Sequence, residues 1–369
     1  MAMSLSAAVR KEWFLGVSLA TCAVFFLYGR DFCTGSQSVL LLAFVWLFVA
    51  VLGSTLSVVR HADHLAELLG EPYGTLILTL AVTAIEVVSI SAMMLRSTNH
   101  PSLMSDTIFA VLMITLNAMV GLTLIIGAWR HREQQYNLQG ANAYLGVIIP
   151  VAVLGMILPN FTQTTPGPTL SSAQETFLVL MSIALYATFL GIQTGRHRGY
   201  FTLLEGKNTE HGQEAEDRAN SLLGHSALLA AFMFPVVFLA DELAHPLNAL
   251  IETSGAPTAL GGIAIAVLVA TPEAIGAIRA AVKNHLQRSV NILLGSVLST
   301  ISLTIPAMIM ISHFTGQPIV LGLQHGNLVM LVLTLTVSVV TFASGRTNVL
   351  QGVVHFLLFL AYLLLVFQG

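Results

Sequence analysis

Residues 37–59 read QSVLLLAFVWLFVAVLGSTLSVV, a run without one charged side chain. A helix needs about 20 predominantly apolar residues to cross the hydrocarbon core of a bilayer, so this run predicts a spanning helix. The run lacks the alternation of apolar and polar residues that marks the strands of a membrane barrel. Comparable runs recur along the chain and predict eleven spanning helices, near residues 13–28, 37–59, 73–95, 107–128, 142–158, 175–194, 222–240, 259–280, 291–312, 319–343 and 349–367.

The composition of the 369 residues also predicts an all-α integral membrane protein. Hydrophobic residues make up 55% of the chain and charged residues only 9%, whereas an ordinary soluble domain carries roughly 25% charged residues. The net charge of −3 argues against nucleic acid as a partner. Cys22 and Cys33 are the only cysteines, which excludes a disulfide scaffold as the organising feature. The run that starts at Trp13 has no small-residue cleavage site, so we expect no cleaved secretion signal.

The basic residues predict the orientation of the helices. Cytoplasmic loops of membrane proteins carry an excess of Lys and Arg. With a cytoplasmic N-terminus and eleven spans, all 15 Lys and Arg residues except Arg30 and Arg96 fall on the cytoplasmic side. The odd number of spans then places the C-terminus in the periplasm. We therefore expect a multi-pass protein of the bacterial inner membrane, with the lipid bilayer as its partner and an oligomeric state that the sequence leaves open.

Two parts of the chain repeat each other weakly. Residues 62–66 read ADHLA and residues 240–244 read ADELA, and each is followed by an apolar run that contains a single acid. Each predicted repeat holds five helices, an odd number, so the second is inverted relative to the first, as in many secondary transporters. The linker between them is either a solvated connection or an acidic segment that attracts cations. The predicted parts are an N-terminal segment with the first helix, a first repeat, an acidic cytoplasmic linker and a second repeat, at residues 1–36, 37–195, 196–220 and 221–369.

The two single acids, Glu86 and Glu273, are the predicted cation-binding and proton-binding residues. An ionisable side chain deep in a span costs about 3 kcal/mol on insertion scales, so it is a functional candidate by default. Pro272 has no backbone N–H, which leaves the carbonyl oxygen of Leu268 without its helical donor and free to face a cation. Further oxygen ligands are expected from polar residues in the same spans and the next ones, namely Thr83, Thr271, Asn117, Ser296, Ser299 and Thr300.

These residue types indicate the chemistry of the site. Carboxylates, hydroxyls and carbonyls are hard oxygen ligands of the kind that calcium prefers. Soft ligands are missing nearby, which argues against copper or an iron–sulfur cluster. In a poorly solvated site, two close carboxylates hold protons when no cation is bound. Competition between cations and protons for the same oxygens would couple their movements without a cofactor.

Three segments carry a family resemblance, residues 80–86 (LAVTAIE), 271–273 (TPE) and 291–306 (NILLGSVLSTISLTIP). In these segments the sequence resembles the calcium/proton exchangers of the cation/Ca2+ antiporter superfamily, in particular the bacterial ChaA type that exchanges calcium, sodium or potassium for protons. The resemblance spans nearly the whole chain and implies that the two glutamates carry the cation and the protons. Most of the wider superfamily has Asn three residues before each acid, where this chain has Thr83 and Ala270. That departure argues against strict selectivity for calcium.

The predicted function is secondary active transport, in which cytoplasmic calcium, and also sodium and potassium, exchanges for protons by alternating access to a midplane site. The alternatives are a sodium/proton or potassium/proton antiporter with little calcium transport, and a cation channel. An enzyme is not expected, because the sequence lacks zinc-protease, nucleophile-elbow and phosphate-loop motifs. Asp63, Asp241 and Glu242 are either solvated interfacial residues or funnels that concentrate cations. His355 is expected to be a hydrogen-bonded core residue rather than a proton relay.

Overall fold

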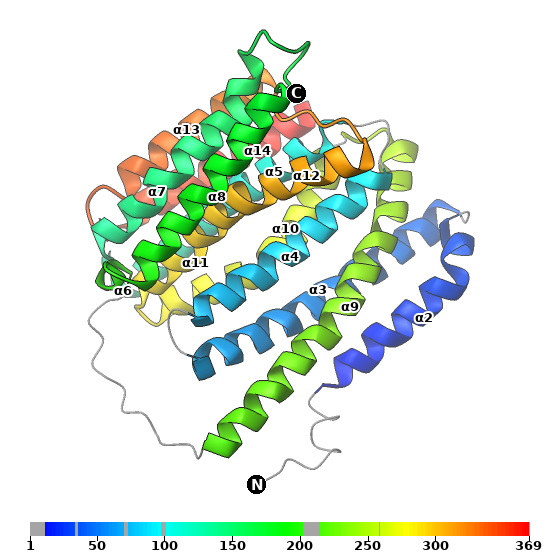
Figure 1. Cartoon of the computed structure of the whole chain (residues 1–369), viewed down its shortest axis with the longest axis horizontal. Helices are drawn as coiled ribbons and strands as arrows, with labels where there is room; N and C mark the ends of the chain where they lie inside the picture. Colours follow the sequence, from blue (N-terminus) through cyan, green and yellow to red (C-terminus); the bar gives the residue numbers. More distant parts are fainter. Residues whose placement is uncertain are drawn as a thin grey trace. The chain divides into compact units, whose positions relative to one another are not determined.

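The computed structural model describes residues 12–33, 36–69, 73–96, 101–201, 215–257 and 259–368. This part of the chain is almost entirely helical, and a helix is found at every predicted span (Figure 1). Eight of its helices are long and apolar enough to cross a membrane, and shorter apolar helices cover Trp13–Gly29, Leu80–Leu95 and His325–Thr341. The predicted all-α membrane architecture is therefore confirmed.

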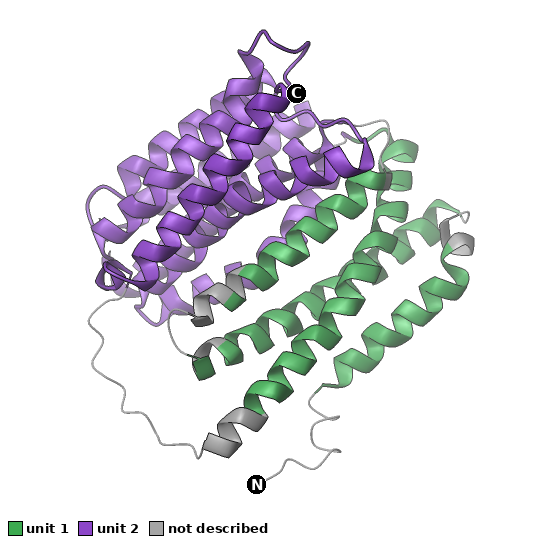
Figure 2. Ribbon diagram, in the orientation of Figure 1, with its two compact units in different colours: residues 1–96, 211–256 green, residues 97–210, 257–369 purple. Residues whose placement is uncertain are grey.

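The chain divides into two compact units, residues 1–96 with 211–256 and residues 97–210 with 257–369 (Figure 2). Each unit takes helices from both predicted repeats, so the repeats are not compact bodies and remain a prediction. The helices of unit 1 are α2 (Trp13–Cys33), α3 (Gln37–Leu69), α4 (Tyr73–Arg96) and α9 (Ala215–Ser254). The elements of unit 2 are α5 (Leu103–Met113), η1 (Ile114–Met119), α6 (Val120–His131), β1 (Gln134–Gln135), α7 (Leu138–Ala152), η2 (Val153–Ile157), η3 (Leu158–Asn160), α8 (Ser172–Thr194), η4 (Arg198–Tyr200), α10 (Ala259–Val282), α11 (Leu286–Ser299), η5 (Thr300–Thr304), α12 (Ile305–Thr315), α13 (His325–Thr341), β2 (Arg346–Thr347) and α14 (Val349–Gln368).

In unit 1, α3 and α9 pack along each other, and α2 and α4 each contact both of them. The core between α3, α4 and α9 consists of small and large apolar side chains in contact. Such contacts act mainly through close van der Waals packing, because lipid tails are as apolar as the side chains they would replace. The buried members of this core are Val58, Ala62, Ala81, Ile85, Phe232 and Val236.

The two long helices of unit 1 extend beyond their predicted spans. α3 continues to Leu69 instead of ending at residue 59, and α9 continues to Ser254 instead of ending at residue 240. The polar residues after each apolar run form further helical turns, because a helix satisfies its backbone hydrogen bonds within itself whatever its side chains are. In unit 2 the difference is smaller, since α13 begins at His325 rather than at residue 319. Most of the predicted acidic linker, residues 202–214, lies outside the described residues.

Two helices of unit 2 share the same interruption. A π-helical segment, η1, joins α5 to α6, and another, η5, joins α11 to α12. These are the third helices of the two predicted repeats. η1 packs against α14, the last helix of the second repeat, and η5 packs against α8, the last helix of the first. The packing is reciprocal, although the repeat itself stays a prediction, and π segments inside α-helices occur often at functional sites.

Side-chain caps set the starts of α7 and α8. The side chain of Asn137 accepts the backbone N–H groups of Gln139 and Gly140, at 2.9 and 3.4 Å, and so begins α7. Ser171 and Gln174 form a reciprocal capping box that begins α8. Both caps satisfy N–H groups that have no partner inside their helix.

Four loops of unit 2 meet at one end of the unit. β1 pairs antiparallel with β2, which joins the loop after α6 to the loop after α13. Gln134 donates its amide to the carbonyl oxygen of Ala281 in the last turn of α10, at 2.8 Å, and to the side-chain oxygen of Asn284 in the loop after α10, at 3.0 Å. Asn137 donates to the carbonyl oxygen of Gly199 in the loop after α8, at 3.3 Å. These four loops are the ones that the sequence predicts to be cytoplasmic.

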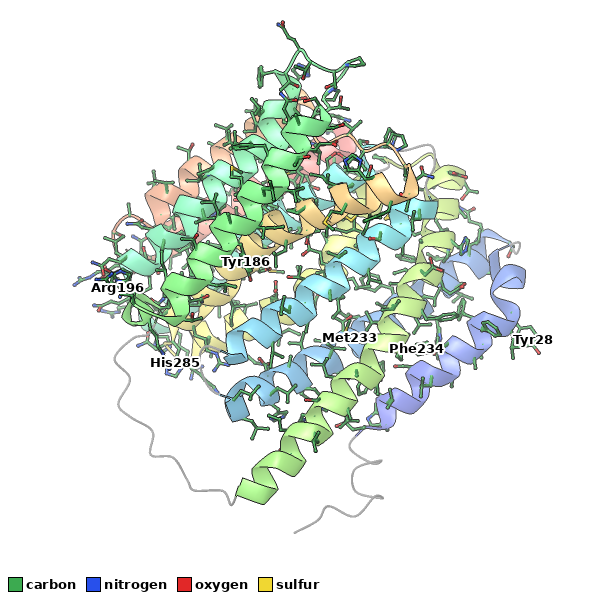
Figure 3. All side chains as sticks on the ribbon, in the orientation of Figure 1. Tyr28, Tyr186, Arg196, Met233, Phe234 and His285 are labelled. Atoms are coloured by element: carbon green, nitrogen blue, oxygen red, sulfur yellow. The ribbon has the colours of Figure 1, made fainter. Side chains whose placement is uncertain are left out.

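The same end of unit 2 collects its basic side chains, and Figure 3 labels Arg196 and His285 there. Among the described residues of unit 2, the opposite end carries no Lys or Arg. This separation of charge is what the positive-inside rule requires of a membrane protein. The basic residues at this end are Arg130, Arg132, Arg196, Arg198, Arg279, Lys283, Arg288 and Arg346.

Candidate cation-binding site

Glu273 is the only acid of α10, a helix built otherwise from small and apolar residues and one terminal Arg. Pro272 lies inside the helix next to it and cannot donate to the carbonyl oxygen of Leu268. The helix is narrow enough for close packing: a Cβ added at Gly262 would lie 3.0 Å from the backbone of Thr107 on α5. α10 thus packs among α5, α6, η1 and α11, and carries the half-buried carboxylate of Glu273.

The nearest polar partner of Glu273 comes from α11. Ser296 donates its hydroxyl to a carboxylate oxygen of Glu273. Ser299, one turn later, donates its hydroxyl to the carbonyl oxygen of Ser296 at 2.8 Å, and Thr300 begins η5 directly after it. The structure therefore brings Ser296 to Glu273 and places the other two hydroxyl residues on the same helix. A donated hydroxyl hydrogen can turn away when a cation arrives, so the same oxygen can serve either partner.

Glu86 is the corresponding acid of unit 1. It lies on α4 and its side chain is only 2% exposed. Thr83, one turn before it, and Ser89, one turn after it, are buried on the same helix. Their hydroxyl oxygens have no hydrogen-bond partner among the described residues. Buried polar atoms without partners are rare, and at functional sites they are often ligands for a water or an ion.

Asn117 and Thr271 are engaged elsewhere. Asn117, at the middle of η1, donates its amide to the hydroxyl of Thr334 at 2.8 Å, and its carbonyl oxygen lies 3.3 Å from Nδ1 of His355. It therefore faces α13 and α14 rather than Glu273. Thr271 donates its hydroxyl to the carbonyl oxygen of Val267 at 2.6 Å, within its own helix. Their expected role as cation ligands stays a prediction.

Sequence reasoning missed the partners of Asn117, although one signal was present. Thr334, Ser338 and Thr341 recur on α13 at the spacing of one helix face, and all are buried in an otherwise apolar helix. Such a polar stripe in a membrane helix indicates contact with polar groups of neighbouring helices. The predicted hydrogen-bonded state of His355 agrees with its contacts.

The predicted funnel residues lie on helices and not in loops. Asp63 belongs to α3, and Asp241 and Glu242 belong to α9. The carboxylate of Glu242 lies beside α2, since a Cβ added at Gly29 would be 3.0 Å from it. Whether these acids attract cations stays a prediction.

A histidine cluster in unit 1 was not predicted. Nδ1 of His61 on α3 lies 2.9 Å from Nδ1 of His225 on α9, and the ring of His64 stacks on that of His225. Glu12 accepts from Arg60 and lies 3.4 Å from the other ring nitrogen of His61. Two facing ring nitrogens can share one proton, but both cannot carry one.

One titratable group outside the spans also has a defined state. Tyr136, between β1 and α7, is buried, and its hydroxyl donates to the carbonyl oxygen of Thr341 at 3.3 Å. The backbone N–H of Gly345 donates to the same hydroxyl at 3.2 Å. Burial raises the pKa of the Tyr136 hydroxyl, so the group stays neutral and ties two loops together.

The sequence is similar to known transporters over most of its length. Residues 39–195 and 225–368 match the family described as sodium/calcium exchanger protein. The chain is 35% identical over 365 residues to the sodium-potassium/proton antiporter ChaA of Escherichia coli, and the match covers 97% of this chain and 96% of that protein.

The fold is similar to those of two solved structures. The structure of native YfkE superposes with a TM-score of 0.74 at 17% identity, covering 96% of this chain and 100% of that chain. The crystal structure of the H+/Ca2+ exchanger CAX gives a TM-score of 0.71 at 16% identity, covering 96% of this chain and 88% of that chain. The described helices, the family match and the near full-length relative agree. The chain therefore belongs to the sodium/calcium exchanger protein family, as a multi-pass membrane cation/proton antiporter.

Proposed function

We propose that the protein exports cytoplasmic cations in exchange for protons at a site that contains Glu86 and Glu273, and that it takes sodium and potassium as well as calcium. The observation that carries this proposal is a single acid in each of two apolar spans, with hydroxyl groups beside it. Ser296 accompanies Glu273, and Thr83 and Ser89 accompany Glu86. Acids at this depth are retained where they do chemistry, because they weaken insertion into the membrane.

Exchange follows from competition for the carboxylate oxygens. A partly desolvated carboxylate favours its neutral form, so it holds a proton while no cation is present. An arriving cation displaces that proton, because a charged oxygen binds a cation and a protonated one does not. A site that opens to one side of the membrane at a time then converts the proton gradient into cation export. The reaction needs no nucleotide, since the gradient supplies the energy.

Two observations favour a broad choice of cation. Thr83 and Ala270 stand where the resemblance leads us to expect an Asn ligand, so the site has fewer strong oxygen donors than a dedicated calcium site. Calcium takes six to eight oxygen ligands. We therefore expect the loss of two amide oxygens to weaken calcium binding more than the binding of a monovalent ion. The similar protein of Escherichia coli is named a sodium-potassium/proton antiporter.

The basic end of unit 2 supports a cytoplasmic position for the loops after α6, α8, α10 and α13. This orientation places the N-terminus in the cytoplasm and the C-terminus in the periplasm of a bacterial inner membrane. Export then carries cations from the basic end to the opposite end. The substitutions Ser344→Cys and Ser171→Cys place a cysteine in a loop at each end of unit 2. Labelling each variant from either side of intact vesicles tests this orientation.

The exchange itself is tested in liposomes with a preset proton gradient. Calcium, sodium or potassium is added outside, and proton movement is followed with a pH-sensitive dye for the parent and for Glu86→Gln and Glu273→Gln. We expect all three cations to dissipate the gradient in the parent, and neither variant to respond. Gln keeps the size and the hydrogen-bonding atoms of Glu but cannot exchange a proton.

Glu252→Gln is the matched control, because Glu252 is exposed near the end of α9 and should leave exchange unchanged. A response to calcium alone would restrict the proposal to a calcium/proton antiporter. Cation flux without proton movement would instead favour the channel. Full exchange in either Glu86→Gln or Glu273→Gln would remove that residue from the mechanism.

A further inference from the structure

A buried network of hydrogen bonds joins η1 to α13 and α14 in unit 2. Asn117 on η1 donates to the hydroxyl of Thr334 on α13, and its carbonyl oxygen faces Nδ1 of His355 on α14 at 3.3 Å. Nε2 of His355 lies 3.0 Å from the hydroxyl of Thr341 on α13. All four side chains are buried. These hydrogen bonds therefore join η1, α13 and α14 at a depth where no water can substitute for a lost partner.

The contacts fix the protonation of His355. The Asn117 oxygen can only accept, so Nδ1 of His355 carries the proton, and Nε2 of a neutral ring then accepts from the hydroxyl of Thr341. Among the elements packed against α14, α6, η1 and α13 contain no acid that could pair with a charged ring, and the one acid of α5, Asp106, lies near Tyr362, about two turns along α14 from His355. The only other ionisable groups on these elements are Arg130 and His131 at the end of α6 and His325 at the start of α13, together with Tyr362 on α14 itself. A neutral His355 is satisfied at both nitrogens.

A close helix crossing makes these contacts possible. A Cβ added at Gly352 would lie 2.8 Å from the backbone nitrogen of Ile125 and 2.9 Å from the carbonyl oxygen of Gly121. α6 and α14 therefore touch backbone to backbone, one turn from Asn117 and His355. This approach is the usual use of glycine between membrane helices, and here it brings an imidazole against a π segment.

The π segment η1, which these hydrogen bonds hold, forms part of the surroundings of Glu273. η1 packs against α10, which carries Glu273, and against α11, which carries Ser296. A π segment has a strained backbone pattern that persists only when its neighbours hold it.

We propose that His355, as a neutral imidazole, is a positioning residue that holds Asn117 and with it η1 against α10 and α11, and so keeps the Glu273 site in its cation-binding geometry. The inference rests on the proposed function, because it assigns His355 a role toward the Glu273 site. His355 does not carry the exchanged proton. Residues behind metal ligands affect affinity through orientation, and their loss typically weakens binding about 10-fold to 100-fold.

The test compares three variants in the liposome assay, with Glu273→Gln beside them. In His355→Asn the side-chain amide can still donate to Asn117, whereas His355→Leu removes both contacts and His355→Gln reaches toward Thr341 instead. We expect His355→Leu to raise the cation concentration for half-maximal exchange about 10-fold or more. His355→Asn should restore it to within about 3-fold of the parent and leave the pH profile of exchange unshifted. His355→Gln should resemble His355→Leu.

Several results would overturn the inference. Parent-like affinity in His355→Leu would show that η1 needs no support from α14. A shifted pH profile in His355→Asn would assign His355 to proton transfer. If His355→Leu does not fold, the nitrogen-15 shifts of the labelled parent decide: a neutral ring protonated at Nδ1 is expected, and a charged ring or the other tautomer contradicts it. Exchange by Glu273→Gln would overturn the proposed function, whereas an inactive Glu273→Gln beside an unaffected His355→Leu would remove this inference alone.

Discussion

The helix interrupted by η1 and the helix interrupted by η5 share a backbone form but hold it with different side chains. At η1, Asn117 is bonded to Thr334 and faces His355 on two neighbouring helices. At η5 three of the four buried residues, Thr300, Ser302 and Thr304, carry small hydroxyl side chains, and the fourth is Ile301. Ser302 on η5 and Ser182 on α8, the helix packed against it, have hydroxyls without a hydrogen-bond partner among the described residues.

The two helices also differ in their contact with Glu273. When α5 and α11 are aligned at their first residues, Ser296 matches Met113 and Thr300 matches Asn117. Ser296 donates to Glu273, whereas Met113 accepts weakly from Asn117 at 3.5 Å. The difference teaches that two helices with the same backbone interruption can have different polar chemistry at matched positions. We infer that these hydrogen bonds hold η1 in one conformation. We infer also that the hydroxyl groups of the helix interrupted by η5 reorient toward a bound cation.

The largest effect is expected where the backbones touch beside η1. Gly352→Ala places a Cβ against the backbone of α6, which cannot move aside as a flexible side chain would. We expect a loss of about 3 kcal/mol in the free energy of unfolding, measured as a lower thermal midpoint of the purified protein. Gly295→Ala on the η5 helix is the matched control, because its nearest neighbour is the ring of Tyr144 at 3.7 Å. Equal midpoints for the two variants would contradict the close crossing.

The next effect separates the polar residues at the matched positions. Asn117→Leu leaves the buried Thr334 hydroxyl and the Nδ1 of His355 facing an apolar side chain. An unsatisfied buried group costs about 1–3 kcal/mol, so we expect a drop of about 2 kcal/mol in the free energy of unfolding. Thr300→Val removes one hydroxyl and keeps the shape, so its effect should be smaller. The reverse order of the two thermal midpoints would show that η5 is the more firmly held segment.

A third variant tests the donor at Glu273. Ser296→Ala removes the hydroxyl that reaches the carboxylate and leaves the fold in place. We expect the cation concentration for half-maximal exchange to rise about 10-fold, which corresponds to 1.4 kcal/mol. Ser289→Ala removes a hydroxyl of the same helix that donates to the carbonyl oxygen of Ala277, and it should leave this concentration nearly unchanged. A parent-like response of Ser296→Ala would exclude the hydroxyl from the cation site.

The smallest effect is expected at η5 itself. Ser302→Ala removes a buried hydroxyl that has no partner among the described residues, so nothing is left unsatisfied. We expect a change within about 0.5 kcal/mol in the free energy of unfolding, in either direction. A thermal midpoint as low as that of Asn117→Leu would mean that the Ser302 hydroxyl has an essential partner.

The sequence predicts the fold well because a helix that crosses the bilayer must be apolar along its length, and this shows in the hydropathy of the sequence. All eleven runs correspond to helices, and the basic residues of unit 2 gather at the end that the alternation of spans requires. The ends of α3 and α9 could not be predicted from the same signal, since Asp63 and Asp241 are polar but helical. The π segments also escape it, because they depend on packing between helices and leave the apolar pattern unchanged.

The candidate site was found from the sequence, and its role in cation binding stays a prediction. Lone acids in apolar spans make Glu86 and Glu273 candidates, and the hydroxyl-rich helix after Glu273 makes Ser296 one, which the structure places in contact with Glu273. The orientation of Asn117 could not be predicted, because its partners lie on α13 and α14, far along the chain. A polar side chain in a membrane helix has a choice of neighbours, and only the three-dimensional packing selects one.

Proton release on cation binding tests most directly that cation and proton compete for the same two acids. Weakly buffered, purified protein is mixed with calcium or sodium, and the released protons are counted beside the bound cation. We expect release in the parent that fades as the pH rises and the carboxylates lose their protons beforehand. Glu86→Gln and Glu273→Gln should each release fewer protons. Cation binding without proton release at any pH, or full release from both variants, would contradict competition as the basis of exchange.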